Sequence, residues 1–187
     1  MATIVKVEFE GAKELDDLFK QIQNDFGLKD ASKIMRNAVR ASMKPVLETA
    51  KALAPKDTGG LAASLQVETR RPSRKDRNSK YIELGDSVIG LVTTASGKKL
   101  AKRQFTNIKT GEKESFVTVN KKVKGKEVIS NDQRAAAMEF GTSKVASKPF
   151  LRGALENSSQ SVAGSLGQSL KISLEKYKAK QAKKGIV

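Results

Sequence analysis

The sequence predicts an α+β fold in which a small antiparallel sheet packs against a long kinked helix and a C-terminal helix, with a protruding β-hairpin arm. Three observations lead to this prediction. Short stretches alternate apolar and polar residues as strands do, two long stretches repeat apolar residues at helical spacing, and strongly charged segments separate them. At 187 residues the chain can bury one sizeable core, so we expect a single domain over residues 1–187.

The N-terminal part predicts a strand followed by a helix. Residues 3–10 alternate apolar and polar side chains with the period of a half-buried strand. From Leu15 to Phe26 the apolar residues recur at helical spacing, with acidic and amide side chains on the other face. Gly27 follows this stripe and is the expected C-terminal stop of the helix.

A longer apolar stripe from Ile34 to Leu53 predicts a second helix, for which Asp30 can serve as the N-terminal cap. Pro45 lies inside the stripe, and its ring removes one backbone donor. We therefore expect a kink near the preceding turn and not two separate helices. Pro55 ends this helix.

The first of two corners lies in the stretch Ala-Pro-Lys-Asp-Thr-Gly-Gly-Leu. Asp57 and Thr58 are both good caps for a short helix, after which residues 66–69 turn extended. The neighbouring Gly59 and Gly60 would let another backbone come close.

Two charged segments flank a strand region. Residues 70–80 are polar and basic and predict a loop or a hairpin tip in solvent, and residues 81–94 predict a strand. Within residues 96–132, two short apolar runs at 105–108 and 116–119 flank a Lys-Thr-Gly-Glu turn. They predict a β-hairpin arm that has too little apolar surface for its own core and needs a neighbour to become rigid.

The second corner, Glu139-Phe140-Gly141-Thr142, leads toward Pro149, which stands where a first-turn proline is favoured. A long C-terminal helix follows. Its predicted apolar face consists of Leu151, Leu155, Ser158, Val162, Leu166, Leu170 and Leu174. Residues 175–187 are rich in lysine and lose the apolar stripe, so we expect them to fray into a basic tail.

Composition excludes several kinds of chemistry. The chain has no Cys and no His, which excludes disulfides, thiolate chemistry, Cys/His metal sites and imidazole acid-base catalysis. Its start lacks the pattern of a signal peptide, and no stretch approaches a membrane span. We therefore expect an aqueous, cytoplasmic setting without a membrane partner.

The carboxylates at the corners have structural explanations. Asp57-Thr58-Gly59 is the residue string of aspartic proteases, but it follows Ala-Pro-Lys where those enzymes have an apolar strand, and helix capping explains it. Glu139 has no second acid nearby in the sequence, so we expect it to accept the backbone donors of the Gly141-Thr142 turn or to pair with a basic residue. No Gly-rich phosphate loop occurs. We predict no catalytic, cofactor or metal site and no small-molecule substrate.

Basic residues are the remaining candidates for a binding surface. Lys and Arg total 36 against 20 Asp and Glu, for a formal net charge of +16. Three clusters are candidate contacts for DNA or an acidic partner, and a merely solvated surface is the alternative for each. Their members are Arg70, Arg71, Arg74, Lys75 and Arg77; Lys98, Lys99, Lys102 and Arg103; and Lys121, Lys122 and Lys124. Aromatic residues are almost absent from the clusters, which argues against sequence-specific or single-strand recognition.

Taken together, the two corners resemble the neck or tail-completion proteins of long-tailed bacteriophages, the family that includes minor tail protein Z-like members. That family combines Ala-Pro and Asp-Thr-Gly-x-Leu-x-x-Ser with a later Glu-Phe-Gly-Thr, a variable loop, and Pro-Phe-Leu before an Ala-Leu helix. The matching residues are Ala54, Pro55, Asp57, Thr58, Gly59, Leu61, Ser64, Glu139, Phe140, Gly141, Thr142, Pro149, Phe150, Leu151, Ala154 and Leu155. Residues 135–137 are alanines where family members often place an aromatic, and the arm resembles an elaboration.

The resemblance implies a non-enzymatic virion protein that assembles in the host cytoplasm. It implies a ring, six-fold, between the head-closure and tail-terminator rings, which joins capsid to tail around the DNA passage. Basic residues facing the lumen would hold DNA through its phosphates without sequence preference. The alternative is a free, basic, sequence-nonspecific nucleic-acid-binding protein. An enzyme that depends on Asp57 is a third and weaker hypothesis.

Overall fold

The structure is a computed structural model that describes residues 12–79, 82, 88–95, 103–116 and 131–183. The chain divides into two compact units. The first consists of Met1–Pro45, Val67–Leu91 and Ser159–Val187, and the second of Val46–Gln66 and Val92–Ser158. Each unit has its own buried cluster.

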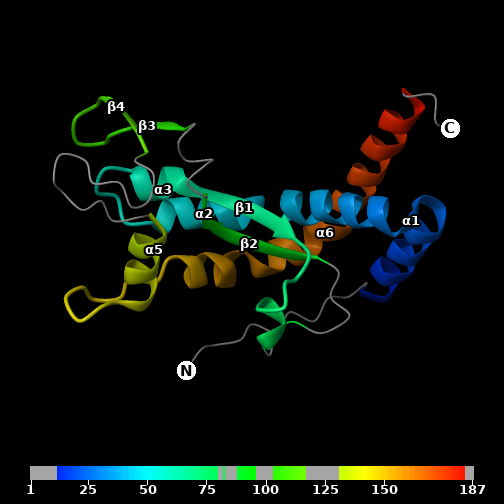
Figure 1. Cartoon of the computed structure of the whole chain (residues 1–187), viewed down its shortest axis with the longest axis horizontal. Coiled ribbons are helices and arrows are strands. Elements are labelled where there is room, and N and C mark those ends of the chain that lie inside the picture. The colour runs from blue at the N-terminus through cyan, green and yellow to red at the C-terminus, as the bar shows by residue number, and fades with distance from the viewer. Residues whose placement is uncertain (1–11, 80–81, 83–87, 96–102, 117–130, 184–187) are drawn as a thin grey trace. The chain divides into compact units, whose positions relative to one another are not determined.

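The described elements confirm the predicted α+β class (Figure 1). They are α1 (Ala12–Ser42), α2 (Lys44–Leu53), α3 (Gly60–Ser64), β1 (Leu65–Arg70), the 3-10 helix η1 (Asp76–Asn78), β2 (Ile89–Thr94), β3 (Gln104–Thr106), β4 (Lys113–Ser115), α5 (Asn131–Phe140) and α6 (Leu151–Ala182). Strands β1 and β2 form one two-stranded sheet, and β3 and β4 form another. The strand predicted at residues 3–10 lies outside the described residues.

Both predicted interruptions of the N-terminal helices occur. Gly27 has φ 76° and ψ 162°, which is incompatible with a helix, and α1 changes direction there (Figure 1). The second interruption is Met43, a single residue between α1 and α2 that lies two positions before Pro45. The sequence predicted a kink near Pro45 and not two separate helices, so the separation of α1 from α2 at Met43 corrects that prediction. Met43 N still donates to Val39 O at 3.0 Å across the break.

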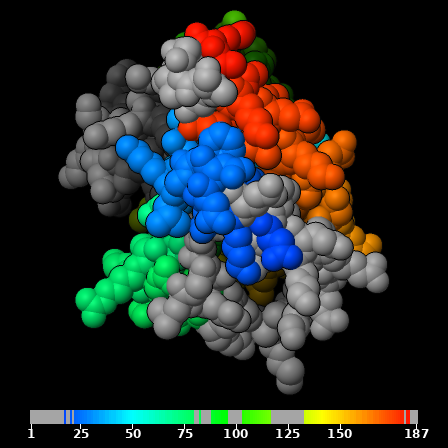
Figure 2. All heavy atoms as spheres, turned by 90° about the vertical axis from the view of Figure 1, so that its right-hand side faces the viewer, coloured from blue at the N-terminus to red at the C-terminus, as the bar shows by residue number. Residues whose placement is uncertain are grey.

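The core of the first unit joins α1 to the C-terminal half of α6, and these helices lie side by side in Figure 2. Its buried members are Ile22, Ala31, Ile34, Ala38 and Leu170, with Phe26, Met35, Leu174 and Tyr177 packed against them. The rings of Phe26 and Tyr177 meet edge to face at 5.4 Å. Because this packing reaches Tyr177, α6 stays helical to Ala182, which corrects the frayed tail expected at residues 175–187 up to that point.

Within the first unit, parts of β1 and β2 lie close to α1. A Cβ added to Gly90 of β2 would come within 2.6 Å of Val39 Cγ1 and 3.2 Å of Met43 Cγ. Nη2 of Arg40 also donates to Thr69 Oγ1 of β1 at 3.0 Å. Helix and sheet are thus joined by close packing and by a polar bond.

The hairpin of the second unit packs onto the first corner of its own chain. In the antiparallel β3–β4 register Phe105 pairs with Glu114, and the turn between the strands closes at Gly111, whose φ is 72°. The second strand therefore starts three residues earlier than the 116–119 run predicted. The ring centroids of Phe105 and Phe116 lie 4.9 Å apart, and both rings pack with Ala63 and the buried Ala95. The neighbour against which this part of the arm packs is the helix α3, to which Ala63 belongs.

The buried face of α6 in the second unit agrees with the predicted one at Ser158 and differs from it at Leu155. Leu155 is 49% exposed, whereas the neighbouring Ala154 is fully buried. Small side chains face α2 here, since Ser158 Oγ lies 3.1 Å from Thr49 Oγ1 and a Cβ at Gly153 would lie 3.7 Å from Leu53. The apolar spacing was compatible with either face, and close packing on α2 selects the smaller residues.

Candidate functional site: two corners and a basic surface

The second corner is organised by the carboxylate of Glu139, the penultimate residue of α5. Its Oε2 accepts the backbone N–H groups of Phe150 and Leu151, each at 2.9 Å. Its Oε1 accepts the backbone N–H of Arg152 at 3.1 Å and the Nε of the same residue at 2.9 Å. One side chain thus satisfies three of the donors that the first turn of a helix leaves open. It also places a negative charge at the positive end of α6.

The environment of Glu139 favours its ionised form. The side chain is almost completely buried, at 4% exposed, and burial alone would raise its pKa. The backbone N–H of Leu151, the side chain and N–H of Arg152 and the N–H of Phe150 outweigh burial and lower the pKa below the ordinary value of 4.5. A carboxylate held ionised by four donors is a structural cap and is poorly suited to donate a proton.

A tight loop connects Glu139 to α6. Gly141 takes up φ 78° and its N–H donates to Ala137 O at 2.9 Å, which ends α5. Oγ1 of Thr142 accepts the N–H groups of Lys144 and Val145 at 3.2 and 3.0 Å. The expectation that Glu139 pairs with a basic residue is confirmed, but its backbone donors come from α6, and Thr142 serves the turn.

An aromatic side chain and an arginine stand on the outside of this corner. Phe140 is 74% exposed, and the guanidinium carbon of Arg152 lies 5.4 Å from its ring centroid. Arg152 is fixed from behind, because its Nη2 also donates to the Glu139 carbonyl at 3.0 Å. The next motif residue, Phe150, is 1% exposed and anchors the helix start in the interior.

The first corner differs from its prediction, because neither Asp57 nor Thr58 occupies the N-cap position of α3. Asp57 does not cap α3: it forms an ion pair with Lys109 of the hairpin, and its side chain is 75% exposed. The N-cap position is Gly59, in the left-handed region at φ 84°, and Oγ1 of Thr58 accepts the Gly60 N–H at 3.4 Å. Lys109 both bonds to and attracts the Asp57 carboxylate, which lowers the pKa of Asp57.

A close approach occurs at the two glycines, but the nearest atoms belong to side chains and not to the backbone that was expected. Added Cβ atoms would meet the side chain of Ile108 at 3.1 Å from Gly59, and the ring of Phe105 at 3.1 Å from Gly60. Ile108 N also donates to Thr58 O at 3.2 Å. The hairpin can pack this closely because Gly59 and Gly60 have no side chains. The other motif residues of the corner, Leu61 and Ser64, are buried in α3.

The two corners belong to the same unit and are linked directly. Helix α3, which follows the first corner, packs against α5, which ends in the second. Sequence reasoning did not single out Arg152 or Lys109. Arg152 follows Phe150 by two residues, and Lys109 lies at the tip of the hairpin. Neither position is a strong signal in the sequence, because the partner of each lies far away along the chain.

The basic cluster at residues 70–77 divides into bound and exposed members. Arg70 binds the Asp76 carboxylate through two nitrogens, and this contact, with the hydroxyl and N–H of Ser73, holds the pKa of Asp76 well below its ordinary value. Nη2 of Arg71 donates to Ser32 Oγ of α1 at 2.8 Å. Arg74 and Lys75 are exposed.

The other two clusters are mostly undescribed. Of their members only Arg103, which is exposed, lies within the described residues. Lys98, Lys99, Lys102, Lys121, Lys122 and Lys124 lie outside them. The described residues contain no group of three or more acidic side chains arranged to hold a metal ion. Among the helices of that same part of the chain, none is long and apolar enough to cross a membrane.

Comparison with models of known protein families identifies a relationship to phage proteins. A family model described as "Bacteriophage HK97-gp10, putative tail-component" (HK97-gp10-like) matches residues 16–141. The match begins in α1, includes the whole first corner and ends at Gly141 of the second. No curated protein and no solved structure matches the chain.

Proposed function

Since the chain belongs to the HK97-gp10-like family of bacteriophage tail components, we propose that it is a structural virion protein that forms a ring at the head-tail junction. In this role it joins the capsid to the tail and surrounds the passage for DNA. The observation that carries the proposal is the family match over more than half of the chain, together with the order of its two corner motifs. Six copies per ring and contact with the head-closure and tail-terminator rings are parts of the same proposal.

The chemistry of the corners supports a structural role without catalysis. The Glu139 carboxylate is occupied by four donors, and Asp57 is exposed and paired with Lys109. An aspartic-protease pair requires two carboxylates that share a proton in a protected site. The exposure of Asp57 and its lysine partner are unfavourable for that arrangement.

The outside of the second corner is suited to contact with a neighbouring subunit or ring. Aromatic and arginine side chains are enriched at protein interfaces, and a side chain that is already fixed loses little entropy when a partner binds. Phe140 is largely exposed, and Arg152 is held beside it by Glu139. We assign Phe140 and Arg152 to such a contact.

The basic loop at residues 70–77 is the proposed contact with DNA in the lumen. Arg74 and Lys75 are exposed, and both can reach phosphate without reading bases. Arg70 and Arg71 have protein partners, so we expect them to shape the loop more than to bind DNA. The net charge of +16 also favours the second candidate function, a free nonspecific nucleic-acid-binding protein.

Deletion of the gene from the phage genome tests the leading proposal. Negative-stain electron microscopy of the lysate should show separate filled heads and finished tails, and the wild-type gene supplied on a plasmid should restore joined particles. Plasmids encoding Phe140→Ser, and Leu28→Ser as the matched control at an apolar residue of comparable exposure, locate the interface. Normal, infectious virions from the deletion strain would overturn the proposal. Strong retardation of duplex DNA by the isolated protein would then favour the free binder.

A further inference from the structure

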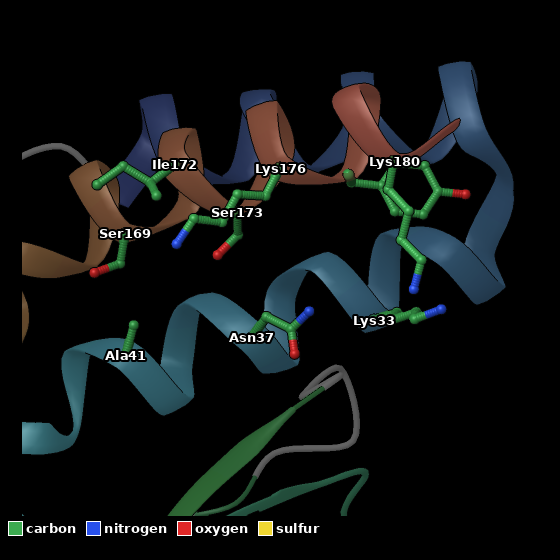
Figure 3. A pocket seen from close by; sticks show the side chains of 9 residues that line it. Lys33, Asn37, Ala41, Ser169, Ile172, Ser173, Lys176 and Lys180 are labelled. Atoms are coloured by element: carbon green, nitrogen blue, oxygen red, sulfur yellow. The ribbon is translucent and has the colours of Figure 1, made fainter. Parts of the chain in front are cut away.

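A groove of about 490 Å³ lies between α1 and the C-terminal half of α6, within the first unit (Figure 3). One wall is a row on α1 that includes Lys33, Asn37 and Ala41. The other wall is a row on α6 that includes Ile172, Lys176 and Lys180. Successive residues named in each row are four positions apart, which places them along one face of each helix.

The groove has a basic end and an apolar end. Lys33, Lys176 and Lys180 are exposed, and no carboxylate is among the described residues that line the groove. Ala41 and Ile172 supply the apolar part, and Ile172 is 42% exposed. A nucleic-acid backbone would use the lysines and leave Ile172 uncovered. A peptide segment that carries both carboxylates and apolar side chains would use both ends.

The chain itself contains a segment with this chemistry. Residues 6–17, Lys-Val-Glu-Phe-Glu-Gly-Ala-Lys-Glu-Leu-Asp-Asp, carry five carboxylates and two lysines, in a chain whose formal net charge is +16. Val7, Phe9 and Leu15 provide apolar side chains between the acids. The Asp17 carboxylate is 72% exposed, and its contact with Lys20 is long at 4.0 Å.

We propose that the groove between α1 and α6 binds residues 6–17 of a second copy of this chain. This inference rests on the proposed ring, for which it names a contact between subunits. The groove and the acidic segment are different surfaces, so the contact is head-to-tail: each copy offers its segment to one neighbour and its groove to the other. Such a contact closes into a ring when the rotation between copies permits it.

The arrangement of α1 favours a second copy over the same copy as the source of the segment. Ile22 and Phe26 pack with Leu170 and Tyr177 in the apolar core, and that packing fixes the part of α1 that follows the segment. No described residue before Lys33 lines the groove. The described part of α1 that follows the segment is thus held in the core and does not line the groove, which favours another molecule as the source of the segment.

Cysteine cross-linking tests the contact without side reactions of other thiols, because the natural chain has no Cys. Ala12→Cys places a thiol in the segment, and Ser173→Cys places one in the groove. Purified single variants are mixed and oxidised. The same mixture is also added to a lysate of the gene-deletion strain, so that assembled particles can be analysed. A disulfide-linked dimer is expected from this mixture. Gln160→Cys, exposed on α6 outside the groove, is the matched control and should give none with Ala12→Cys.

Charge reversal provides a second and independent measurement. Lys176→Glu with Lys180→Glu should lower the cross-linking yield about tenfold, and Asp16→Lys with Asp17→Lys in the other copy should restore it. Lys171→Glu with Lys178→Glu makes the same change in charge at exposed sites of α6 that do not line the groove, and it should leave the yield unchanged.

Three outcomes would overturn the inference. One is the absence of the mixed disulfide both in solution and in particles. Another is a disulfide that forms only within one chain when Ala12→Cys and Ser173→Cys are combined. The last is loss of duplex-DNA retardation in the groove variants with unchanged cross-linking, which would assign the lysines to nucleic acid. None of these affects the separated heads and tails of the deletion strain, so failure here and failure of the proposed function are distinguishable.

Discussion

Nε of Arg152 donates a hydrogen bond to Oε1 of Glu139 at 2.9 Å, and the backbone N–H of Arg152 donates to the same oxygen at 3.1 Å. A third bond runs between the same two residues, from Nη2 of Arg152 to the Glu139 carbonyl at 3.0 Å. The last turn of α5 and the first turn of α6 are therefore held together by main-chain and side-chain contacts of one residue pair. The angle at which α6 leaves the corner depends on the Glu139 carboxylate.

Replacement of Glu139 should destabilise the fold. Glu139→Gln keeps an acceptor oxygen but removes the charge that receives four donors, so the free energy of unfolding should fall by about 2 kcal/mol. Urea denaturation followed by circular dichroism measures the change. Glu48→Gln, at an exposed acid on α2, is the control and should have little effect. Equal losses in the two variants would contradict the capping role of Glu139.

The contribution of Glu139 should also depend on pH. Its folded-state pKa lies below the ordinary value of 4.5, so the folded protein binds this proton less tightly than the unfolded chain does. The stabilisation is complete above pH 4.5 and is lost as the pH falls through the folded-state pKa. The difference in Tm between wild type and Glu139→Gln should therefore narrow as the pH falls below 4.5. A difference that stayed constant would mean that the charge of Glu139 is not what stabilises the corner.

Two glycines with positive φ allow backbone strain to be separated from steric contact. Gly111→Ala should cost about 1 kcal/mol from strain alone, because nothing lies within 4 Å of the added Cβ. Gly141→Ala should cost more, because its Cβ would also lie 3.1 Å from Ser147 N and 3.2 Å from Val145 O. Thermal unfolding of both variants provides the comparison. Equal shifts in Tm would show that the loop after Gly141 yields to the new atom.

The packing of β2 on α1 predicts opposite effects of the same substitution at two other glycines. Gly90→Ala should lower the free energy of unfolding by about 1–3 kcal/mol, because its Cβ would meet Val39 at 2.6 Å. The additional change Val39→Ala should recover part of this loss. Gly164→Ala, in α6 with nothing within 4 Å, should raise stability by up to about 1 kcal/mol. A neutral Gly90→Ala variant would mean that β2 can move away from α1.

Features set by neighbouring residues could be predicted from the sequence. The stop at Gly27, the break before Pro45 and the hairpin turn at Gly111 depend on the φ/ψ preferences of one or two residues. The positions of these features could therefore be predicted without knowledge of any tertiary contact.

Features set by distant partners could not be predicted. The helical extension past residue 175 depends on the contact of Tyr177 with Phe26, and the exposure of Leu155 depends on the small side chains that face α2. The pairing of Asp57 with Lys109 requires the hairpin to fold back onto the corner. Helical spacing states which residues share a face, but not which neighbour covers that face.

Substitutions at Asp57 distinguish a structural role of the first corner from a catalytic one. Its carboxylate is exposed and pairs with Lys109, so Asp57→Asn and Lys109→Met remove the same ion pair from opposite sides. An exposed pair contributes little to stability, so both variants should unfold close to wild type and should restore plaques to a gene-deletion phage equally well. If Asp57 were a catalytic acid, Asp57→Asn alone would fail to restore plaques while Lys109→Met succeeded. That result would contradict the structural role assigned to the first corner, whereas equal behaviour would leave the corner as the docking point of the hairpin.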